Sequence, residues 1–358
     1  MVINERVNLK QQTWRNKISN PAQLGGIETS VLDNGTGRGT RIAWINTGTG
    51  LRYKVVIDRA MDIAEAFYNQ HNLCWISHLG ITPPEPFSGG GVDWLRTFGG
   101  GLLTTCGLSQ VGPPEGELGL HGLISNQPAE IESIIQPDPL QGKMEMSITG
   151  RIKETRIFGP SLELKRTISG TLGQPSIRIH DEVVNVANTA FPHMILYHCN
   201  FGWPLVDEGT DILCRGSWQS GGREGDNKIF GEGNNFRKCP APLEHHSGFG
   251  EAVAFVDPDA DASGASSCGL YNENIGIALA LHFNKKQLPW LTNWQHWGKG
   301  EYVTGLEPGT NPPIGQAKAR NQGQLIQLQP GERKIYDLEF EIMDQPISIR
   351  EFLKKHKT

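Results

Sequence analysis

The run Met144-Glu145-Met146-Ser147-Ile148 alternates apolar and polar residues, and two further runs of the same kind follow it. Leu162-Glu163-Leu164-Lys165 and Ile177-Arg178-Ile179 repeat the alternation, with Gly, Pro or Asn residues between the runs. A period of two is typical of a β-strand that buries one face, and such residues are typical of turns. We therefore predict three successive antiparallel strands between residues 144 and 186.

The same alternation recurs along the whole chain. It is found in residues 41–45, 53–57, 275–281 and 336–342. Strands with one buried face belong to antiparallel sheets packed over a core, whereas parallel sheets show continuous apolar runs. We predict an all-β fold of antiparallel sheets packed face to face, with helix confined to residues 92–98 and 348–356.

The composition also favours strands and turns. The 358 residues include 44 Gly and 22 Pro, which favour turns over long helices. One large β domain over residues 1–358 is the simplest interpretation, because all-β domains often exceed the usual domain length. Within it we expect an N-terminal extension at about residues 1–35 and a long surface loop at about residues 216–250, and long loops often carry function.

Charge and cysteine content argue against several classes of protein. Lys and Arg total 33 against 38 Asp and Glu, without a dense basic run, so we expect neither nucleic acid nor membrane as a partner. The first twenty residues lack a signal-peptide core and no apolar run could span a bilayer, which predicts a cytoplasmic protein. The six cysteines are scattered, so we expect free, buried thiols.

Four segments place a titratable side chain beside turn residues. They are residues 56–63 with Asp58 and Arg59, 119–126 with His121, 195–204 with His198, and 302–313 with Glu307. Glu307 interrupts an apolar run and precedes Pro308, which restrains the backbone at the predicted end of a strand. A carboxylate held in this way is a candidate general base.

Each of these residues has a structural alternative. His121, between glycines, fits a surface turn as well as a position close to a ligand. His198, in an apolar run, fits a hydrogen-bonded core histidine. Glu307 fits a turn cap or an ion pair with Arg59, and Arg59 equally fits an ion pair with Asp58.

Motifs for several other chemistries are missing from the sequence. It has no H-E-x-x-H or H-x-H, so we expect no metal site. It also lacks G-x-S-x-G, a phosphate loop and G-x-G-x-x-G, which removes support for a hydrolase triad or a nucleotide cofactor. Tryptophans near the His198 and Glu307 segments favour sugar binding, because an indole packs well on the C–H face of a sugar, although core filling explains them too.

Together, the four segments resemble the galactose mutarotase-like, or aldose 1-epimerase, family, and more closely its bacterial aldose-epimerase-like branch. The matching motifs are Leu120-His121-Gly122, Tyr197-His198-Cys199-Asn200-Phe201-Gly202 and Gly305-Leu306-Glu307-Pro308. They occur in the order and at the wide spacings that the family shows. The segment Asp58-Arg59-Ala60-Met61-Asp62-Ile63 is similar to the branch's N-terminal pattern.

This resemblance implies an antiparallel β-supersandwich with a sugar site in a cleft. It also implies a cofactor-free mutarotase that interconverts the α and β anomers of a monosaccharide or sugar acid. In that reaction Glu307 would be the general base on the anomeric hydroxyl and His198 the general acid at the ring oxygen. His121 would be the second histidine at the same centre.

The sugar is left open by the sequence. The aspartate with which the family's better-known sugar enzymes grip hydroxyls has no clear counterpart, because the matching region, residues 243–251, lacks one. Arg59 leaves room for a sugar with an anionic group. Sugar contacts are expected from Arg59, Asp62, Asn126, Trp203, Trp297 and His246. The alternatives are a non-catalytic carbohydrate-binding protein of the same fold and a lyase or isomerase of sugar acids, and a monomer or homodimer is expected.

Overall fold

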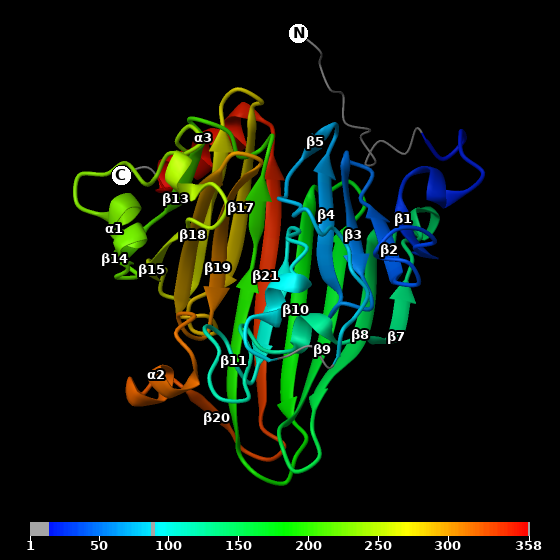
Figure 1. The fold of residues 1–358 in the computed structure, drawn as a ribbon. Helices are drawn as coiled ribbons and strands as arrows, with labels where there is room; N and C mark the ends of the chain where they lie inside the picture. Colours follow the sequence, from blue (N-terminus) through cyan, green and yellow to red (C-terminus); the bar gives the residue numbers. More distant parts are fainter. Residues whose placement is uncertain (1–13, 87–89, 357–358) are drawn as a thin grey trace.

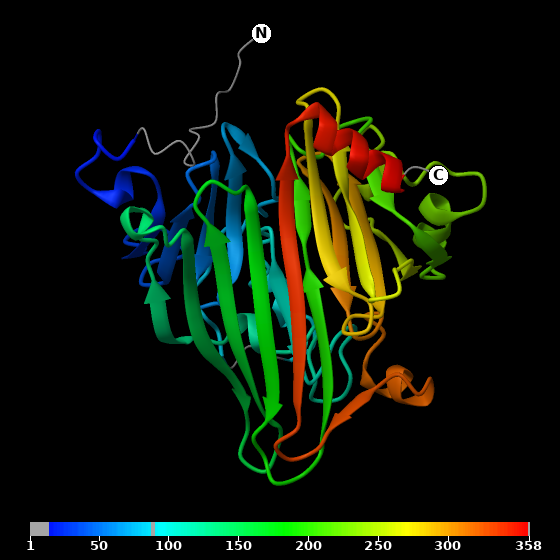
Figure 2. The same ribbon diagram turned by 180° about the vertical axis from the view of Figure 1, so that it is seen from behind.

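The strands of this protein form three antiparallel sheets in a computed structural model, which describes residues 14–86 and 90–356. An eight-stranded sheet makes one layer, and the other two sheets lie side by side against it (Figures 1 and 2). In spatial order the eight strands are β13 (Asp211–Cys214), β16 (Ala265–Asn272), β17 (Ile277–Asn284), β21 (Arg333–Met343), β10 (Ser176–Asn185), β9 (Ser161–Thr171), β8 (Glu145–Thr155) and β7 (Glu130–Ile135).

The opposite layer consists of an N-terminal sheet and the sheet that carries the candidate site. The N-terminal sheet contains β1 (Gly26–Val31), β2 (Arg41–Asn46), β3 (Leu51–Val56), β4 (Asp62–Tyr68) and β5 (His71–Asn72). The site sheet has the order β14 (Gly216–Ser220), β15 (Ala252–Pro258), β18 (Trp290–Gly298), β19 (Glu301–Gly309), β11 (Phe191–His198) and β20 (Ile326–Leu328), with β6 (Thr104–Leu108) paired to β11 and β12 (Asn200–Gly202) paired to β19.

Helices are short and peripheral (Figure 1). They are α1 (Glu224–Phe230), α2 (Gln316–Asn321), α3 (Pro346–His356) and the single-turn 3-10 helices Pro21–Gln23, Asp93–Arg96, Ile124–Asn126, Pro139–Gln141 and Glu244–His246. Both helices expected from the sequence are present, Asp93–Arg96 as a 3-10 turn and α3 as an α-helix, whereas α1 and α2 were not expected. None of the helices in the described ranges is long and apolar enough to cross a membrane.

The core between the layers follows from the predicted alternation. Ile148, Ile168, Ile179 and Leu338 are consecutive partners across β8, β9, β10 and β21, and all four are buried. Along β9 every second residue is buried, as a strand with one face on the core requires. The all-β antiparallel prediction is confirmed, and so is the prediction that all six cysteines are free and buried.

Two predicted boundaries need correction. Residues 1–13 of the expected N-terminal extension lie outside the described residues, but β1 pairs with β2 along its whole length, so the sheet begins well before residue 35. Residues 216–250 are not only loop, since they contain strand β14 and helix α1. Asp226 anchors α1, because its buried carboxylate accepts a 2.8 Å hydrogen bond from the Val253 amide of β15.

Candidate active site

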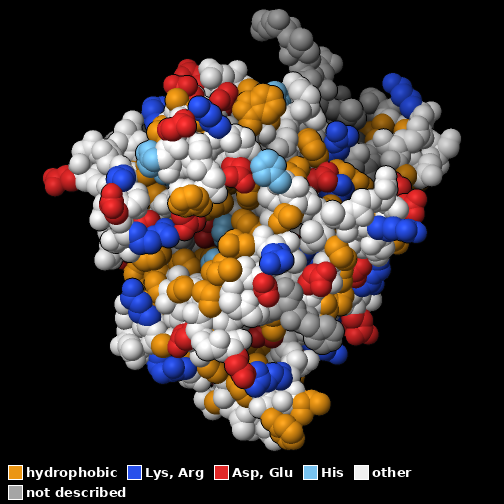
Figure 3. All heavy atoms as spheres, viewed as in Figure 1, with side chains coloured by type: hydrophobic (Ala, Val, Ile, Leu, Met, Phe, Trp, Pro, Cys, Tyr) orange, Lys and Arg blue, Asp and Glu red, His pale blue; other side chains and the backbone are white. Residues whose placement is uncertain are grey.

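A cleft of about 980 Å³ lies over the site sheet. Its floor comes from β11, β15, β18 and β19, and its walls come from residues 75–79, 94–98, 112–121, 221–251 and 313–318. On this face of the molecule hydrophobic side chains gather around a hollow in which histidine side chains are visible (Figure 3). The segment 216–250, expected to be a surface loop, therefore supplies part of one wall.

The alternation of the floor strands determines which side chains enter the cleft. On β18, Thr292, Trp294 and His296 line the cleft, whereas Leu291 and Trp297 on the other face are part of the hydrophobic core. Neighbouring strands follow the same rule, because successive side chains point to opposite faces of a sheet. A one-residue shift in register would exchange the two faces.

His121, His198 and Glu307 come together in this cleft from three distant parts of the chain. His198 is the last residue of β11, and Glu307 lies on β19 opposite Thr292. Nδ1 of His198 lies 3.3 Å from Oε1 of Glu307, and the ring centroids of His121 and His198 are 5.9 Å apart. The separation is small enough for all three groups to reach one sugar ring.

The backbone at each of the three positions is held by its neighbours. His121 has a φ of +57°, which few residues adopt, and its carbonyl accepts a 2.9 Å hydrogen bond from the Gly107 amide. The His198 carbonyl accepts a 2.9 Å hydrogen bond from the Asn200 side chain. Glu307 was predicted to end its strand, but β19 continues through Pro308 to Gly309.

Several buried polar atoms of the cleft have no hydrogen-bond partner within the described part of the chain. They are His121 Nδ1, His198 Nδ1, Thr292 Oγ1 and Glu307 Oε1. The 3.3 Å approach of His198 and Glu307 is thus a close contact without hydrogen-bond alignment. Since buried polar atoms in folded proteins are almost always paired, four such atoms in one cleft indicate a site for a polar ligand.

Burial disfavours charge on all three candidate residues. It lowers the pKa of His121 to about 4 and, together with the nearby His121, the pKa of His198 to about 3. Burial and then the charge of Glu251 raise the pKa of Glu307 well above its usual value. The close contact between His198 and Glu307 acts in the opposite direction, because opposite charges favour each other's ionised form. Burial therefore favours the uncharged form of both members of the pair, and their close contact opposes this effect.

Aromatic rings surround His198. Trp94 and Phe98 stack with their centroids 4.2 Å apart, and Phe98 and Trp294 lie 5.1 and 5.3 Å from the His198 ring. The Trp294 indole also donates a 2.8 Å hydrogen bond to Glu251. These rings keep water away from the His198–Glu307 pair and offer flat apolar surfaces to a ligand.

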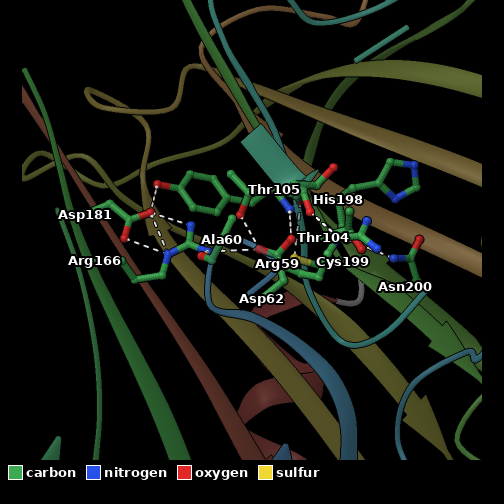
Figure 4. A network of polar contacts seen from close by, with 12 residues as sticks. Arg59, Ala60, Asp62, Thr104, Thr105, Arg166, Asp181, His198, Cys199 and Asn200 are labelled. Atoms are coloured by element: carbon green, nitrogen blue, oxygen red, sulfur yellow. Dashed lines mark hydrogen bonds and ion pairs between the residues drawn. The ribbon is translucent and has the colours of Figure 1, made fainter. Parts of the chain in front are cut away.

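A buried ionic network lies beneath the site (Figure 4). Arg166 donates hydrogen bonds to Asp181 at 2.7 Å and to Asp62 at 3.0 Å. Asp62 in turn accepts hydrogen bonds from the backbone amide of Thr105 at 3.0 Å and from its hydroxyl at 2.6 Å. Thr105 pairs with Tyr197 next to His198, so this network holds β6 against the end of β11.

Six residues expected to contact a sugar do not line the cleft. Asp62 belongs to the network below it. Arg59 is buried, with its guanidinium bonded to the carbonyls of Ser125 and Thr97 and the hydroxyl of Thr82, and Asp58 pairs with Arg41 instead. The side chain of Asn126 donates a hydrogen bond to Thr97, and Trp297 is fully buried. His246 is buried and accepts a hydrogen bond from the Trp297 amide. The side chain of Trp203 is exposed on the surface.

Other cleft residues were not singled out from the sequence. Trp94 and Phe98 stand four residues apart in the predicted helix 92–98, a spacing that places both on one face and would have identified them. Glu251 ends the region that was compared with the family's aspartate, and its carboxylate lies in the cleft between Trp294 and Arg223. No sequence pattern indicates a site role for Arg223, because it lies in the segment 216–250 that is predicted to be a surface loop.

Comparison with known proteins gives the family of the chain. The model of one family, Domain of unknown function (DUF4432), matches residues 37–342. The chain belongs to the DUF4432 family. No curated protein matches its sequence.

Solved structures share the fold of this DUF4432 protein. A proposed aldose 1-epimerase from Klebsiella pneumoniae subsp. pneumoniae MGH 78578 has a TM-score of 0.82 and 24% identity, over 95% of this chain and 88% of that one. A galactose mutarotase-like protein from Clostridium acetobutylicum has a TM-score of 0.63 and 12% identity, over 89% and 98%. Galactose 1-epimerase from Lactobacillus acidophilus NCFM has a TM-score of 0.60 and 12% identity, over 89% and 98%. The galactose mutarotase-like fold implied by the sequence motifs is confirmed.

Within residues 14–86 and 90–356 of this DUF4432 protein, no group of three or more His, Cys, Asp or Glu side chains could hold a metal ion.

Proposed function

We propose that this protein is an aldose 1-epimerase-like mutarotase that interconverts the α and β anomers of a sugar. One observation carries the proposal: His198 and Glu307, a candidate acid and base, lie 3.3 Å apart in an aromatic cleft beside His121. Both carry a buried polar atom that lacks a hydrogen-bond partner among the described residues. The likeness to proteins named aldose 1-epimerases supports the same reaction class.

The reaction needs one proton donor and one proton acceptor. Ring opening removes the proton from the anomeric hydroxyl, breaks the bond between C1 and the ring oxygen, and delivers a proton to that oxygen. Rotation about the C1–C2 bond of the open-chain aldehyde, followed by the reverse steps, gives the other anomer. Each positioned acid or base typically contributes about 10²–10⁴-fold in rate.

A single proton shared by His198 and Glu307 is part of this proposal and suits the chemistry. If ionised Glu307 takes the proton of the anomeric hydroxyl and protonated His198 protonates the ring oxygen, the pair ends in its neutral form. Ring closure restores the ionised form, so the two residues exchange roles without a net change. Burial favours the neutral form and the 3.3 Å contact favours the ionised form, which brings the two forms closer in free energy.

His121 is proposed to orient the sugar at the same centre. Its ring packs against Trp94, with centroids 4.8 Å apart, and its Nδ1 atom is one of the unpaired buried atoms. A largely neutral imidazole, expected from its lowered pKa of about 4, can donate from one nitrogen and accept at the other.

Substitution of Glu307 tests the function. We expect Glu307→Gln to lower kcat for anomer exchange at least about 10²-fold, because the amide keeps the shape but cannot take a proton. Exchange would be measured by polarimetry and NMR across a panel of neutral and acidic sugars. Glu28→Gln is the control, because the exposed Glu28 lies on β1, outside the cleft.

Each outcome of this experiment is informative. Unchanged exchange in Glu307→Gln would contradict the assignment of the base. Saturable sugar binding without exchange by the unmodified protein would favour a binding protein of the same fold. An absorbing unsaturated product or a changed aldose-to-ketose ratio would favour a lyase or an isomerase of another class.

A further inference from the structure

The cleft extends well beyond the three candidate catalytic residues. Its volume of about 980 Å³ is at the upper end of the range of about 300–1,000 Å³ for sites that hold drug-sized ligands. A monosaccharide is much smaller than such ligands. Resting on the mutarotase function proposed above, we propose that the preferred substrate is a neutral reducing disaccharide, with its reducing ring at His198 and Glu307 and its second ring in the outer cleft.

The aromatic lining continues outward in the way that a second ring requires. Trp94 and Phe98, beside the histidines, are buried, whereas Trp75 and Trp294 are only partly buried. Trp294 is placed between the two regions, because its ring lies 5.3 Å from that of His198 and 6.1 Å from that of Trp75. A ligand that extends from His198 past Trp294 toward Trp75 would contact aromatic rings along its whole length. Indole faces suit the C–H faces of sugars.

An exposed apolar residue lies at the rim of the cleft, on the wall formed by residues 221–251. Phe249 lines the cleft, yet its side chain is 94% exposed. A large apolar side chain that is left in solvent beside a ligand cleft gains apolar contact when a ligand covers it. A single ring at the buried inner end would leave this surface uncovered.

Charge in the cleft favours a neutral sugar over an acidic one. The lining residues include four acidic side chains, Asp226, Glu251, Glu301 and Glu307, and two basic ones, Arg223 and Lys318. Arg223 is already paired with Asp226 at 2.9 Å and with Glu251 at 2.7 Å. Of the two basic side chains in the described lining, only Lys318 has no acidic partner, and it is exposed on α2. Arg59, which had suggested an anionic substrate, is outside the cleft.

The acidic groups can serve a neutral sugar directly. Carboxylate oxygens only accept hydrogen bonds, and each oxygen can accept more than one. Glu251 is 40% exposed at its side chain and Glu301 is 32% exposed, so both retain accepting capacity for hydroxyl donors. Hydroxyl groups of a second sugar ring supply such donors without bringing a negative charge.

The test compares sugars of different size and charge on the full-length protein. NMR exchange rates would give kcat/KM for glucose, galactose, maltose, cellobiose, lactose and glucuronate, and calorimetry with Glu307→Gln would give their affinities. We expect at least one neutral disaccharide to exceed every monosaccharide and glucuronate by about tenfold or more in kcat/KM. A monosaccharide or glucuronate preferred over all three disaccharides would overturn this inference and leave the mutarotase function standing.

Binding separates the two proposals if turnover fails. Tighter binding of a disaccharide than of any monosaccharide, without exchange by the unmodified protein, would support the ligand class and overturn the mutarotase function. Neither binding nor exchange with any of these sugars would overturn both.

A pair of exposed phenylalanines provides a further check. Phe249→Ala should lower the ratio of disaccharide to monosaccharide kcat/KM by about fivefold, the loss expected for one aromatic contact. Phe158→Ala is the matched control, because Phe158 is equally exposed but lies in the turn between β8 and β9, outside the cleft. An equal ratio in both variants would contradict the placement of the second ring beside Phe249.

Discussion

At the scale of single residues, the position of the Glu307 carboxylate depends on a glycine two positions before it. A Cβ atom added at Gly305 would lie 2.3 Å from Oε1 of Glu307 and 3.3 Å from Cβ of Trp294. Gly305 and Glu307 share one face of β19, because side chains alternate along a strand. The glycine thus leaves the space that the carboxylate occupies.

We expect Gly305→Ala to displace the Glu307 carboxylate and to lower kcat for anomer exchange at least about tenfold, since small displacements of a catalytic group are costly. Its free energy of unfolding should change by less than about 2 kcal/mol, because the clash is with the end of a side chain. Gly170→Ala on β9 is the control, since its nearest neighbours lie 3.5 Å or more from the added Cβ. Full activity in Gly305→Ala would show that the carboxylate has room to move.

At the scale of strands, the Arg166 network explains how the end of β11 is held in place. Arg166 and Asp181 are both fully buried, and Tyr197 donates a 2.8 Å hydrogen bond to Asp181. A buried ion pair contributes little net stability compared with apolar packing, but removal of one partner leaves a buried charge. The network therefore fixes which strands meet beneath His198 rather than supplying most of the stability.

We expect Arg166→Met to lower the free energy of unfolding by about 3–5 kcal/mol, because Asp62 and Asp181 lose their common partner. Urea denaturation followed by tryptophan fluorescence would measure it. Arg151→Met is the matched control on the neighbouring strand β8, where partly exposed pairs with Glu132 and Glu163 are expected to cost less than about 1 kcal/mol. Similar losses in the two variants would contradict the special role of the buried network.

At the scale of the whole molecule, buried histidines connect stability to pH. His121 and His193 both have pKa values lowered to about 4, mainly by burial. Because the folded pKa lies below the unfolded one, their contribution to stability is present above about pH 6.5 and is lost as the pH falls toward 4. Glu307 acts in the opposite sense, since its raised pKa makes its contribution complete below about pH 4.5 and lost as the pH rises through the folded value.

We expect the free energy of unfolding to fall between about pH 6.5 and 4, with roughly 3 kcal/mol of the loss due to His121 once it is fully protonated. Urea denaturation of His121→Asn over this pH range should show a correspondingly smaller loss. His180→Asn is the control, because the His180 side chain is 46% exposed. An unchanged pH dependence in His121→Asn would show that this histidine does not charge on unfolding.

The location, the oligomeric state and the ligand of the whole molecule remain predictions. The cytoplasmic location and the monomeric or dimeric state were inferred from composition and family resemblance, and size-exclusion chromatography with light scattering would measure the latter. A carbohydrate ligand is part of the proposed function and is tested by the sugar panel described above.

The antiparallel β architecture was determined by the sequence alone, because an alternation of period two is a local property of each strand and survives without knowledge of its partners. The runs at residues 144–186 became β8, β9 and β10 with their predicted faces on the core. The resemblance of short motifs also pointed to His121, His198 and Glu307, which the structure brings into one cleft.

The tertiary structure alone decided which polar residues share one space. Arg59 and Asp62 read in sequence as ligand contacts, yet both are satisfied by partners far away in the chain, Arg59 by Ser125 and Asp62 by Arg166. Arg223 falls in the segment predicted to be a loop, yet it lines the cleft together with Glu251 beside Trp294. Contacts between residues that are far apart in the sequence determine which side chains are buried and which lie close together. These contacts exist only once the sheets have packed.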